Sequence, residues 1–357
     1  MREWVYPLSV KGKFQRIHRW TGLVLQAFLF VTPWLTVQGH PAVQFDLEAR
    51  RAFLLGHVFT AKDSVFLVLL ALLATFSLFF FTALFGRLWC GYGCPQTVFL
   101  EEWIRPIEML LEGERGVRRA RDKQGWTWRK PAKWAIFALL AFVVAMTFTS
   151  WFAGARALWS GQSGTAAYGV VAFLSGVMFL DFAWFREQFC NYLCPYARFQ
   201  GALSDEGSLA VAYRVELGEP RKGEGRCIGC EKCVAVCPQG IDIRTGFQLE
   251  CIACARCVDA CTGVMQKCGY DESLIVYRAL EKRPAVRPRT VAYGALLAGI
   301  SLVLVVLLAA KDELDATVAR APGTLYTVDA DGWIRNTYLL RVSNDSLAAI
   351  DVAVAAE

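Results

Sequence analysis

Five long stretches of this sequence carry almost no charge, and they limit the fold more than any other feature. They are residues 20–37, 64–85, 135–152, 165–185 and 291–310. Each approaches the roughly 20 residues with which an α-helix crosses a hydrocarbon core of about 30 Å. The second stretch contains FLVLLALLATFSLFFFTALF, which is apolar on every face and therefore atypical of a helix in a soluble protein. We expect a mainly α membrane protein with five transmembrane helices.

Composition and one proline refine this expectation. Hydrophobic residues make up 55% of the chain, above the share that is typical of soluble domains. Charged residues still make up 20%, so a substantial part of the chain lies in water. Pro33 lies inside the first stretch, and we expect it to kink that helix without ending it, as membrane helices tolerate.

All Lys and Arg residues lie outside the five stretches, and their distribution predicts the orientation. Residues 1–19, 86–134 and 186–290 hold 30 of the 38, whereas the alternating segments hold 8. Cytoplasmic loops are enriched in Lys and Arg, so we expect the N-terminus in the cytoplasm and the C-terminus in the periplasm. The net charge of +6 follows from this topology, and no basic patch interleaved with aromatic residues indicates nucleic-acid binding.

Eight of the 13 cysteines form two runs between the fourth and fifth stretches. The first run has the spacing C-x2-C-x2-C-x3-C-P, and the second has C-x2-C-x2-C-x3-C. In bacterial ferredoxins three cysteines of such a run bind one [4Fe–4S] cluster, and the fourth binds the other cluster. The spacing thus predicts one cluster on Cys227, Cys230, Cys233 and Cys261, and a second on Cys251, Cys254, Cys257 and Cys237. Such a module transfers single electrons.

Zinc and disulfides explain these eight cysteines less well. Structural zinc sites use two separated pairs in tetrahedral geometry, which does not match runs of four. A reducing cytoplasm disfavours disulfides, and so does the odd number of cysteines. Thr262 stands where the first run has Pro238, which leaves the number of ligands intact, and Cys268 is left over as a bystander thiol.

Four further cysteines form two pairs at the ends of the second and fourth stretches. WCGYGCPQTVF and FCNYLCPYARF both contain C-x3-C-P, and their shared aromatic, Cys, Tyr, Pro and Phe positions are offset by 100 residues. That match predicts a tandem repeat of a two-helix hairpin, with both copies in the same orientation. Cys90 with Cys94 and Cys190 with Cys194 are then expected at the cytoplasmic membrane face, on the side of the clusters.

The chemistry of these pairs follows from their spacing. Cysteines at i and i+4 lie on one face of a helix, so each pair can bind one ion, and two pairs can converge on a four-thiolate site. Soft thiolates select Cu(I), zinc or iron–sulfur centres, and the spacing does not decide among them. Packing of small buried cysteines is the alternative, which two matching pairs disfavour. Asp181, in the fourth stretch, is either a functional acid or an interfacial residue.

These features divide the chain into five parts. They are a basic cytoplasmic tail (1–19), a four-helix membrane domain (20–200), a cytoplasmic two-cluster ferredoxin domain of α+β type (201–290), the fifth helix (291–310) and a β-rich periplasmic tail (311–357). In the tail we expect strands at 323–328, 333–342 and 348–355. Three short strands leave open edges, so the tail either pairs with another segment or is cut short.

Several motifs resemble those of the cytochrome c oxidase accessory protein family CcoG, also called FixG or RdxA. They are WCGYGCPQTV at 89–98, CPYARFQ at 194–200, GEPR at 218–221, CPQGIDIR at 237–244 and LIVY at 274–277. The likeness extends from about residue 10 to 310. RNTY at 335–338 is similar to the start of the immunoglobulin-like outer domain of that family, of which this tail would be a part.

The resemblance implies a polyferredoxin of the bacterial inner membrane that helps to assemble a cbb-type haem–copper oxidase. It implies an oxidoreductase that reduces Cu(II) to Cu(I), with Cys90, Cys94, Cys190 and Cys194 as catalytic residues that bind copper transiently. Expected partners are a cytoplasmic electron donor, a copper carrier or oxidase subunit, and a second copy of the chain. Two other interpretations stay open: a polyferredoxin that passes electrons from quinol to a periplasmic reductase, and a copper-binding scaffold whose clusters are structural.

Overall fold

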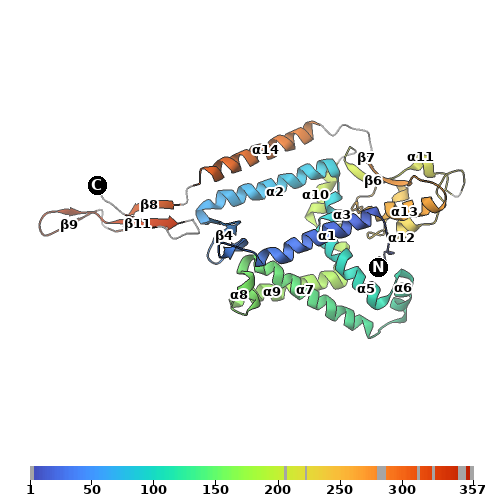
Figure 1. Ribbon diagram of the computed structural model, residues 1–357, viewed down its shortest axis with the longest axis horizontal. Helices are drawn as coiled ribbons and strands as arrows, with labels where there is room; N and C mark the ends of the chain where they lie inside the picture. The colour runs from blue at the N-terminus through green and yellow to red at the C-terminus, as the bar shows by residue number, and fades with distance from the viewer. Residues whose placement is uncertain are drawn as a thin grey trace.

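A computed structural model describes residues 4–204, 207–221, 223–279, 287–311, 314–323, 326–344 and 351–353. Three parts of the protein follow one another along its longest axis (Figure 1). A cysteine-rich unit, residues 207–279, lies at one end near the N-terminus. Long helices form the middle, and a thin β arm projects from the other end. The helical layer therefore has a different structure at each of its two ends.

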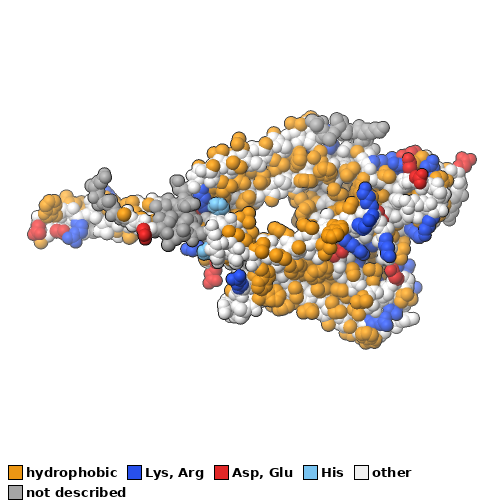
Figure 2. All heavy atoms as spheres, viewed as in Figure 1, with side chains coloured by type: hydrophobic (Ala, Val, Ile, Leu, Met, Phe, Trp, Pro, Cys, Tyr) orange, Lys and Arg blue, Asp and Glu red, His pale blue; other side chains and the backbone are white. Residues whose placement is uncertain are grey.

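Four helices in the described part of the chain are long and apolar enough to cross a membrane. They are α2 (Ser64–Phe85), α7 (Arg129–Ala153), α9 (Thr165–Leu180) with its π-helical extension to Phe185, and α14 (Pro288–Ala309). α2 packs against α14, and α7 packs against α9. Only 6% of the most apolar part of α2, and of α14, is buried within the protein, and apolar side chains cover the helical layer (Figure 2). Such a surface requires lipid, so the chain is a membrane protein.

The first uncharged stretch differs from its prediction. Helix α1 spans Lys13–Val31 and is followed by a 3-10 turn at Thr32–Trp34, so Pro33 ends the helix and the expected kink is wrong. Proline has no N–H for the carbonyl of Leu29. That carbonyl instead accepts a hydrogen bond from the indole N–H of Trp151 at 3.2 Å. The neighbouring helix α7 thus supplies the donor that lets α1 stop here.

The start of α1 is held by the cysteine-rich unit. The backbone N–H groups of Phe14 and Gln15 donate to the Asp259 carboxylate at 3.2 and 2.8 Å. The first turn of a helix has N–H groups without partners, and a carboxylate there also interacts favourably with the helix dipole. Gly12 approaches the same carboxyl group so closely that a Cβ would lie 2.1 Å from its Cγ. This cap ties the N-terminal helix to the cysteine-rich unit.

Replacing Gly12 with alanine is expected to displace the Asp259 carboxylate from the first turn of α1. The loss should be about 1–3 kcal/mol in the free energy of unfolding, the range of lost caps and overpacked contacts. Thermal unfolding of the protein in detergent measures it. Gly116→Ala, in helix α6 (Arg115–Gln124), is the matched control because a Cβ there meets nothing within 4 Å. Equal losses in the two variants would contradict the capping role.

The segment between α1 and α2 forms small antiparallel sheets at the end that faces away from the cysteine-rich unit (Figure 1). β1 (Thr36–Val37) pairs with β2 (His40–Pro41), and β3 (Val43–Asp46), β4 (Arg51–Leu54) and β5 (His57–Phe59) form a three-stranded sheet. Lys311, just after α14, donates to the Asp63 carboxylate at 2.9 Å and to the Val58 carbonyl at 2.8 Å. The loop therefore anchors the end of α14.

The cysteine-rich unit has an α+β fold. β6 (Leu209–Tyr213) pairs antiparallel with β7 (Ile275–Ala279), and helices α11 (Val215–Gly218), α12 (Lys232–Ala235) and α13 (Arg256–Lys267) come between them in the sequence. Its core includes the buried side chains of Val211, Ile243, Val258, Met265 and Ile275. Cys227, Cys233, Cys251, Cys257 and Cys261 pack against that core. The small core thus positions the cysteines.

The β arm is an extended two-stranded ribbon. β8 (Leu314–Arg320) pairs antiparallel with β11 (Tyr338–Asn344), and β9 (Thr327–Val328) pairs with β10 (Ile334–Arg335). β8 was not predicted, and the strand expected at 333–342 is interrupted at 336–337. Residues 348–350 and 354–355 of the third expected strand lie outside the described residues, and 351–353 form no strand. The described strands of the arm pair only two at a time, so their outer edges are open.

Candidate functional site

Two cavities in the cysteine-rich unit are lined by the eight cysteines of the two runs. The first cavity is lined by Cys227, Cys230, Cys233 and Cys261. The second is lined by Cys237, Cys251, Cys254 and Cys257, with Cys233 at its border. The fold therefore groups the cysteines as the ferredoxin spacing predicts, with the last cysteine of each run in the cavity of the other run.

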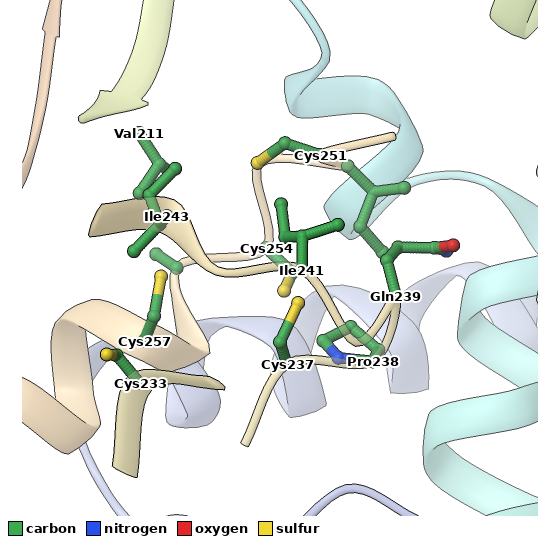
Figure 3. A pocket seen from close by; sticks show the side chains of 12 residues that line it. Val211, Cys233, Cys237, Pro238, Gln239, Ile241, Ile243, Cys251, Cys254 and Cys257 are labelled. Carbon is green, nitrogen blue, oxygen red and sulfur yellow. The ribbon is translucent and has the colours of Figure 1, made fainter. Parts of the chain in front are cut away.

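Figure 3 shows the second cavity from close by. The sulfur atoms of Cys237 and Cys254 point toward each other, and Cys257 rises from helix α13 toward the same space. Within the described residues, no three His, Cys, Asp or Glu groups converge tightly enough to hold one bare metal ion. A four-iron cube binds each thiolate at a different corner, so its ligands surround a volume instead of a point. Four thiols around one cavity match the four corners of such a cluster.

The loops that carry the cysteines share an unusual backbone. Gly229 and Glu231, which flank the second cysteine of the first run, have φ of 67° and 56°. Ala253 and Ala255, at the equivalent places in the second run, have φ of 54° and 55°. Such left-handed residues turn successive N–H groups to one side and form a concave anion site, which many iron–sulfur proteins use. The donor set and the backbone together fit two [4Fe–4S] clusters.

The thiols of the second cavity favour their neutral form. Burial raises the pKa of Cys254 to about 12 and that of Cys251 to about 11. Thiolates bind iron and thiols do not, so cluster formation must release these protons, and the positive charge of iron then stabilises the ionised ligands. These cysteines are therefore suited to be metal ligands and poorly suited to be free nucleophiles.

The other four cysteines gather where the two C-x3-C-P copies meet. Cys90 lies in α3 (Leu88–Tyr92), Cys94 precedes α4 (Pro95–Phe99), Cys190 lies in a π-helical turn (Phe189–Leu193), and Cys194 precedes α10 (Pro195–Leu203). Burial, and then the charges of the other three thiols, raise the pKa of Cys190 to about 12. The four thiols are thus close enough to affect one another's ionisation, although no three of them converge on one point.

A buried amide contacts one of these thiols. The Cys90 S–H donates to Gln200 Oε1 at 3.2 Å, and the Gln200 side chain is fully buried. Gln200 Nε2 has no hydrogen-bond partner among the described residues. A buried N–H without a partner costs about 1–3 kcal/mol. The Gln200 amide therefore holds the neutral Cys90 thiol through its carbonyl oxygen.

The two copies share a backbone bend just before their cysteines. Gly86 has φ 58° and ψ −128°, and Arg186, offset by 100 residues, has φ 53° and ψ −125°. Glycine adopts this conformation readily, and a Cβ at Gly86 would also lie 2.4 Å from the Leu209 carbonyl oxygen. For an arginine the conformation costs about 1–3 kcal/mol. The Arg186 side chain is held there by a buried ion pair with Glu108.

The residue after each Cys-Pro forms hydrogen bonds with the segment that precedes the other cysteine pair. Gln96 donates to the Asp181 carboxylate at 3.0 Å and to the Arg186 carbonyl at 3.1 Å. Tyr196, offset from Gln96 by 100 residues, shares a hydrogen bond of 2.7 Å with Thr82. These reciprocal contacts hold the two cysteine pairs together, and they give Asp181 a partner in the first copy.

The first cysteine pair also touches the loop of the second cavity. Gly91 lies so close to this loop that a Cβ would be 2.6 Å from the Ile252 carbonyl oxygen and 3.0 Å from the Cys254 backbone. The Tyr92 hydroxyl donates to the Cys254 carbonyl at 3.4 Å and lies 3.3 Å from the Tyr277 hydroxyl. The segment between Cys90 and Cys94 is therefore in contact with the loop of the second cavity.

A buried ionic network fastens the cysteine-rich unit to the helices. Glu101 forms ion pairs with Arg105 and with Arg256, which lies between two cysteines of the second run. Arg105 also donates to the carbonyl of Pro238 at 3.4 Å. Buried charges are tolerated only when they are paired and hydrogen-bonded, so this network is stable only while all of its members are present.

Glu108 is the centre of a neighbouring buried network. Its carboxylate contacts Arg118 at 2.8 Å and Lys133 at 3.7 Å, besides its ion pair with Arg186. Burial alone would raise the pKa of Glu108, but the charges of Arg186 and Arg118 outweigh burial and lower the pKa below its usual 4.5. The folded protein therefore favours the ionised carboxylate.

The lowered pKa of Glu108 predicts loss of stability in acid. A carboxyl group whose folded pKa is lowered stabilises the fold above its unfolded pKa, and this contribution is lost as pH falls through the folded pKa. The Tm is therefore expected to fall as pH decreases below about 4.5. Thermal unfolding at a series of pH values measures this, and Glu108→Gln should flatten the dependence. A variant with the slope of the wild type would contradict the role of Glu108.

Sequence reasoning found the cysteines but missed the residues that place them. Gln96 and Tyr196 occupy equivalent positions after the two Cys-Pro pairs, yet their different side chains hide the equivalence. Gly91 carries no signal of its own, because the second copy has Asn191 there. Cys268, the spare cysteine, is exposed after α13 and lines neither cavity.

Family models match the parts of the chain that carry these features. A 4Fe–4S dicluster domain matches residues 185–225 and 219–280, and a 4Fe–4S binding domain matches residues 66–114. The IG-like fold at the C-terminus of FixG matches residues 304–357. No solved structure matches the chain.

Three curated proteins are similar over nearly the whole chain. Protein RdxA of Cereibacter sphaeroides is 35% identical over 96% of this chain and 80% of its own length. Protein RdxB of the same organism is 37% identical over 99% of this chain and 82% of its own length. The nitrogen fixation protein FixG of Rhizobium meliloti is 32% identical over 96% of this chain and 77% of its own length.

In the described part of the chain, four apolar helices are joined to a unit in which eight cysteines line two cavities. These features define a membrane-bound iron–sulfur protein of the electron-transfer type. The identity and coverage of its relatives show that the chain belongs to the family of RdxA, RdxB and FixG. The resemblance inferred from its motifs is thus confirmed, and so are its iron–sulfur domains and the IG-like character of its C-terminal segment.

Proposed function

We propose that this protein reduces Cu(II) to Cu(I) for the assembly of a cbb-type haem–copper cytochrome c oxidase. The observation that carries the proposal is the gathering of four soft thiols beside Gly91 and Tyr92, two residues that contact the loop of the second cavity. A metal ion on these thiols would lie within reach of an electron held beside Cys254. The arrangement therefore supports an electron transfer protein whose acceptor is a bound metal ion.

The four thiols suit copper as the substrate. Thiolates are soft ligands that favour Cu(I), so they stabilise the product ion and draw its reduction forward. For one electron, each ~59 mV of potential difference is a factor of ten in the equilibrium constant. The proposed copper ligands are Cys90, Cys94, Cys190 and Cys194.

The eight cysteines of the two runs are the proposed cluster ligands, in the two groups that line the cavities. When bound, [4Fe–4S] clusters supply electrons one at a time, which matches a one-electron reduction. The loop of the second cavity touches Gly91 and Tyr92, which lie between Cys90 and Cys94. The first cavity includes Cys230, which is exposed, so a cytoplasmic electron donor can approach there.

The proposed topology places both sites on the cytoplasmic side of the bacterial inner membrane. The excess of Lys and Arg in alternating segments supports it. So does the position of the cysteine-rich unit and the β arm at opposite ends of the helical layer (Figure 1). Helix α1 lies among the four long helices and is the proposed fifth membrane helix. The matching bends at Gly86 and Arg186 support the proposed tandem repeat.

An anaerobic assay of Cu(I) formation tests the proposed function. Protein whose iron centres have been reduced chemically is expected to reduce Cu(II) roughly 10–100-fold faster than a variant in which Cys90, Cys94, Cys190 and Cys194 are serine. Iron content and visible absorption should be equal in the two proteins. Equal rates would overturn the proposal. Reduction of the iron centres by membrane quinol alone would favour a polyferredoxin that serves a periplasmic reductase.

A further inference from the structure

The two C-x3-C-P copies have similar backbones but different surroundings. Tyr92 and Tyr192 occupy equivalent positions between their cysteines. Tyr92 is half-buried, and its hydroxyl contacts the Cys254 carbonyl and the Tyr277 hydroxyl. Tyr192 is 67% exposed. An identical residue thus has two different environments, and only the environment of Tyr92 includes the second cavity.

Other contacts of the first copy show the same inequality. The Gly91 backbone touches the loop of the second cavity. Arg87, just before α3, donates to the Leu249 carbonyl of the cysteine-rich unit and, at 2.8 Å, to the Ala197 carbonyl of the second copy. Ser208 donates to the Ala83 carbonyl at 2.9 Å. The first copy therefore lies between the cysteine-rich unit and the second copy.

We propose that electrons enter the copper site through the first copy, and that Tyr92 is the positioning residue that keeps Cys90 and Cys94 against the loop of the second cavity. This inference rests on the proposed function and divides its site into two unequal halves. The first copy receives the electron. The second copy completes the copper ligation with Cys190 and Cys194.

The step is a balanced one-electron transfer. A low-potential one-electron donor reduces the protein beforehand, one electron then passes to one Cu(II), and Cu(I) is the product. The thiolate ligands keep their charge, and no proton moves. Tyr92 keeps its hydrogen bond to the Cys254 carbonyl throughout and is neither oxidised nor deprotonated. Its role is to fix the distance between the two sites.

Matched substitutions at the two tyrosines test this division. Tyr92→Leu and Tyr192→Leu remove the same side chain from equivalent positions, and Tyr92→Phe removes only the hydroxyl. Each protein is reduced with dithionite, freed of excess reductant and mixed anaerobically with Cu(II), and the loss of the Cu(II) EPR signal is followed by rapid freezing. Tyr92→Leu is expected to slow this loss by about 10–100-fold, because a misplacement of about 1 Å can cost 10²-fold. Tyr92→Phe should slow the loss of the Cu(II) signal less than Tyr92→Leu does, and Tyr192→Leu should keep the wild-type rate.

Hydrogen–deuterium exchange of residues 252–254 supplies a second measurement that needs no copper. Exchange there should rise in Tyr92→Leu and stay unchanged in Tyr192→Leu, with equal iron content in both. Equal slowing of Cu(II) reduction by the two leucine variants, or no slowing by either, would overturn the inference. If the wild type reduced no Cu(II), the proposed function would fall. Exchange in Tyr92→Leu at the wild-type level would then overturn the positioning role as well.

Discussion

Replacing Gly91 with alanine is expected to separate the four-thiol site from the second cavity and to slow Cu(II) reduction by roughly 10–100-fold. The added methyl group would lie 2.6 Å from the Ile252 carbonyl oxygen and 3.0 Å from the Cys254 backbone. Both contacts are with backbone atoms, so only a displacement of the loop relieves them. Single-turnover reduction of Cu(II) by protein that has been reduced beforehand measures the effect.

Two controls separate this contact from a general effect of substitution. Gly263→Ala adds the same methyl group to helix α13 of the same unit, where nothing lies within 4 Å of it. Asn191→Ala changes the equivalent position of the second copy. Both variants are expected to keep the rate and the iron content of the wild type. A Gly91→Ala protein with the wild-type rate would show that the close approach is not needed for electron transfer.

Replacing Glu101 with glutamine is expected to lower the free energy of unfolding by about 3–5 kcal/mol, because two buried guanidinium groups lose their shared carboxylate. Arg256 would then lose its carboxylate partner, and Arg105 would keep only the Glu187 carboxylate at 3.9 Å. Arg256 lies in the second cysteine run, so the cysteine-rich unit should detach from the helices before they unfold. Thermal unfolding followed by cluster absorption and by tryptophan fluorescence resolves the two events.

Glu272→Gln is the control for Glu101→Gln. Glu272 pairs with Arg214 at 2.8 Å, but its side chain is 63% exposed. Exposed ion pairs contribute about 0–1 kcal/mol, so this variant should unfold nearly as the wild type does. Similar losses in the two variants would mean that burial of the Glu101 network does not determine its contribution.

Hydropathy predicted the long helices because a membrane-spanning helix must be apolar over most of its length. Helix α2 covers the same residues, 64–85, as its predicted stretch. The end of α1 was not predictable in this way, because it depends on the Trp151 donor from another helix. β8 was missed for a similar reason. It has only two large apolar residues, Leu314 and Val318, and it forms by pairing with β11.

Spacing predicted the grouping of the eight cluster cysteines, because three ligands of one cluster must come from a short loop that wraps around it. The residues that connect the two sites were not predictable from spacing. Position 91 must be glycine because the backbone of Ile252 and Cys254, more than a hundred residues away in the sequence, lies against it. Asp259 likewise caps α1 across 245 residues. Such contacts depend on the packing of finished elements, which no local pattern records.

Simultaneous EPR measurement of iron and copper in one sample tests the central claim most directly. Protein reduced beforehand and mixed anaerobically with Cu(II) is frozen at successive times, and both signals are recorded. The signals of reduced iron and of Cu(II) should disappear together, one electron for each copper, and both should persist in the variant with serine at Cys90, Cys94, Cys190 and Cys194. A reduced-iron signal that persists while Cu(II) is bound, or equal loss in both proteins, would contradict electron transfer to copper at these thiols.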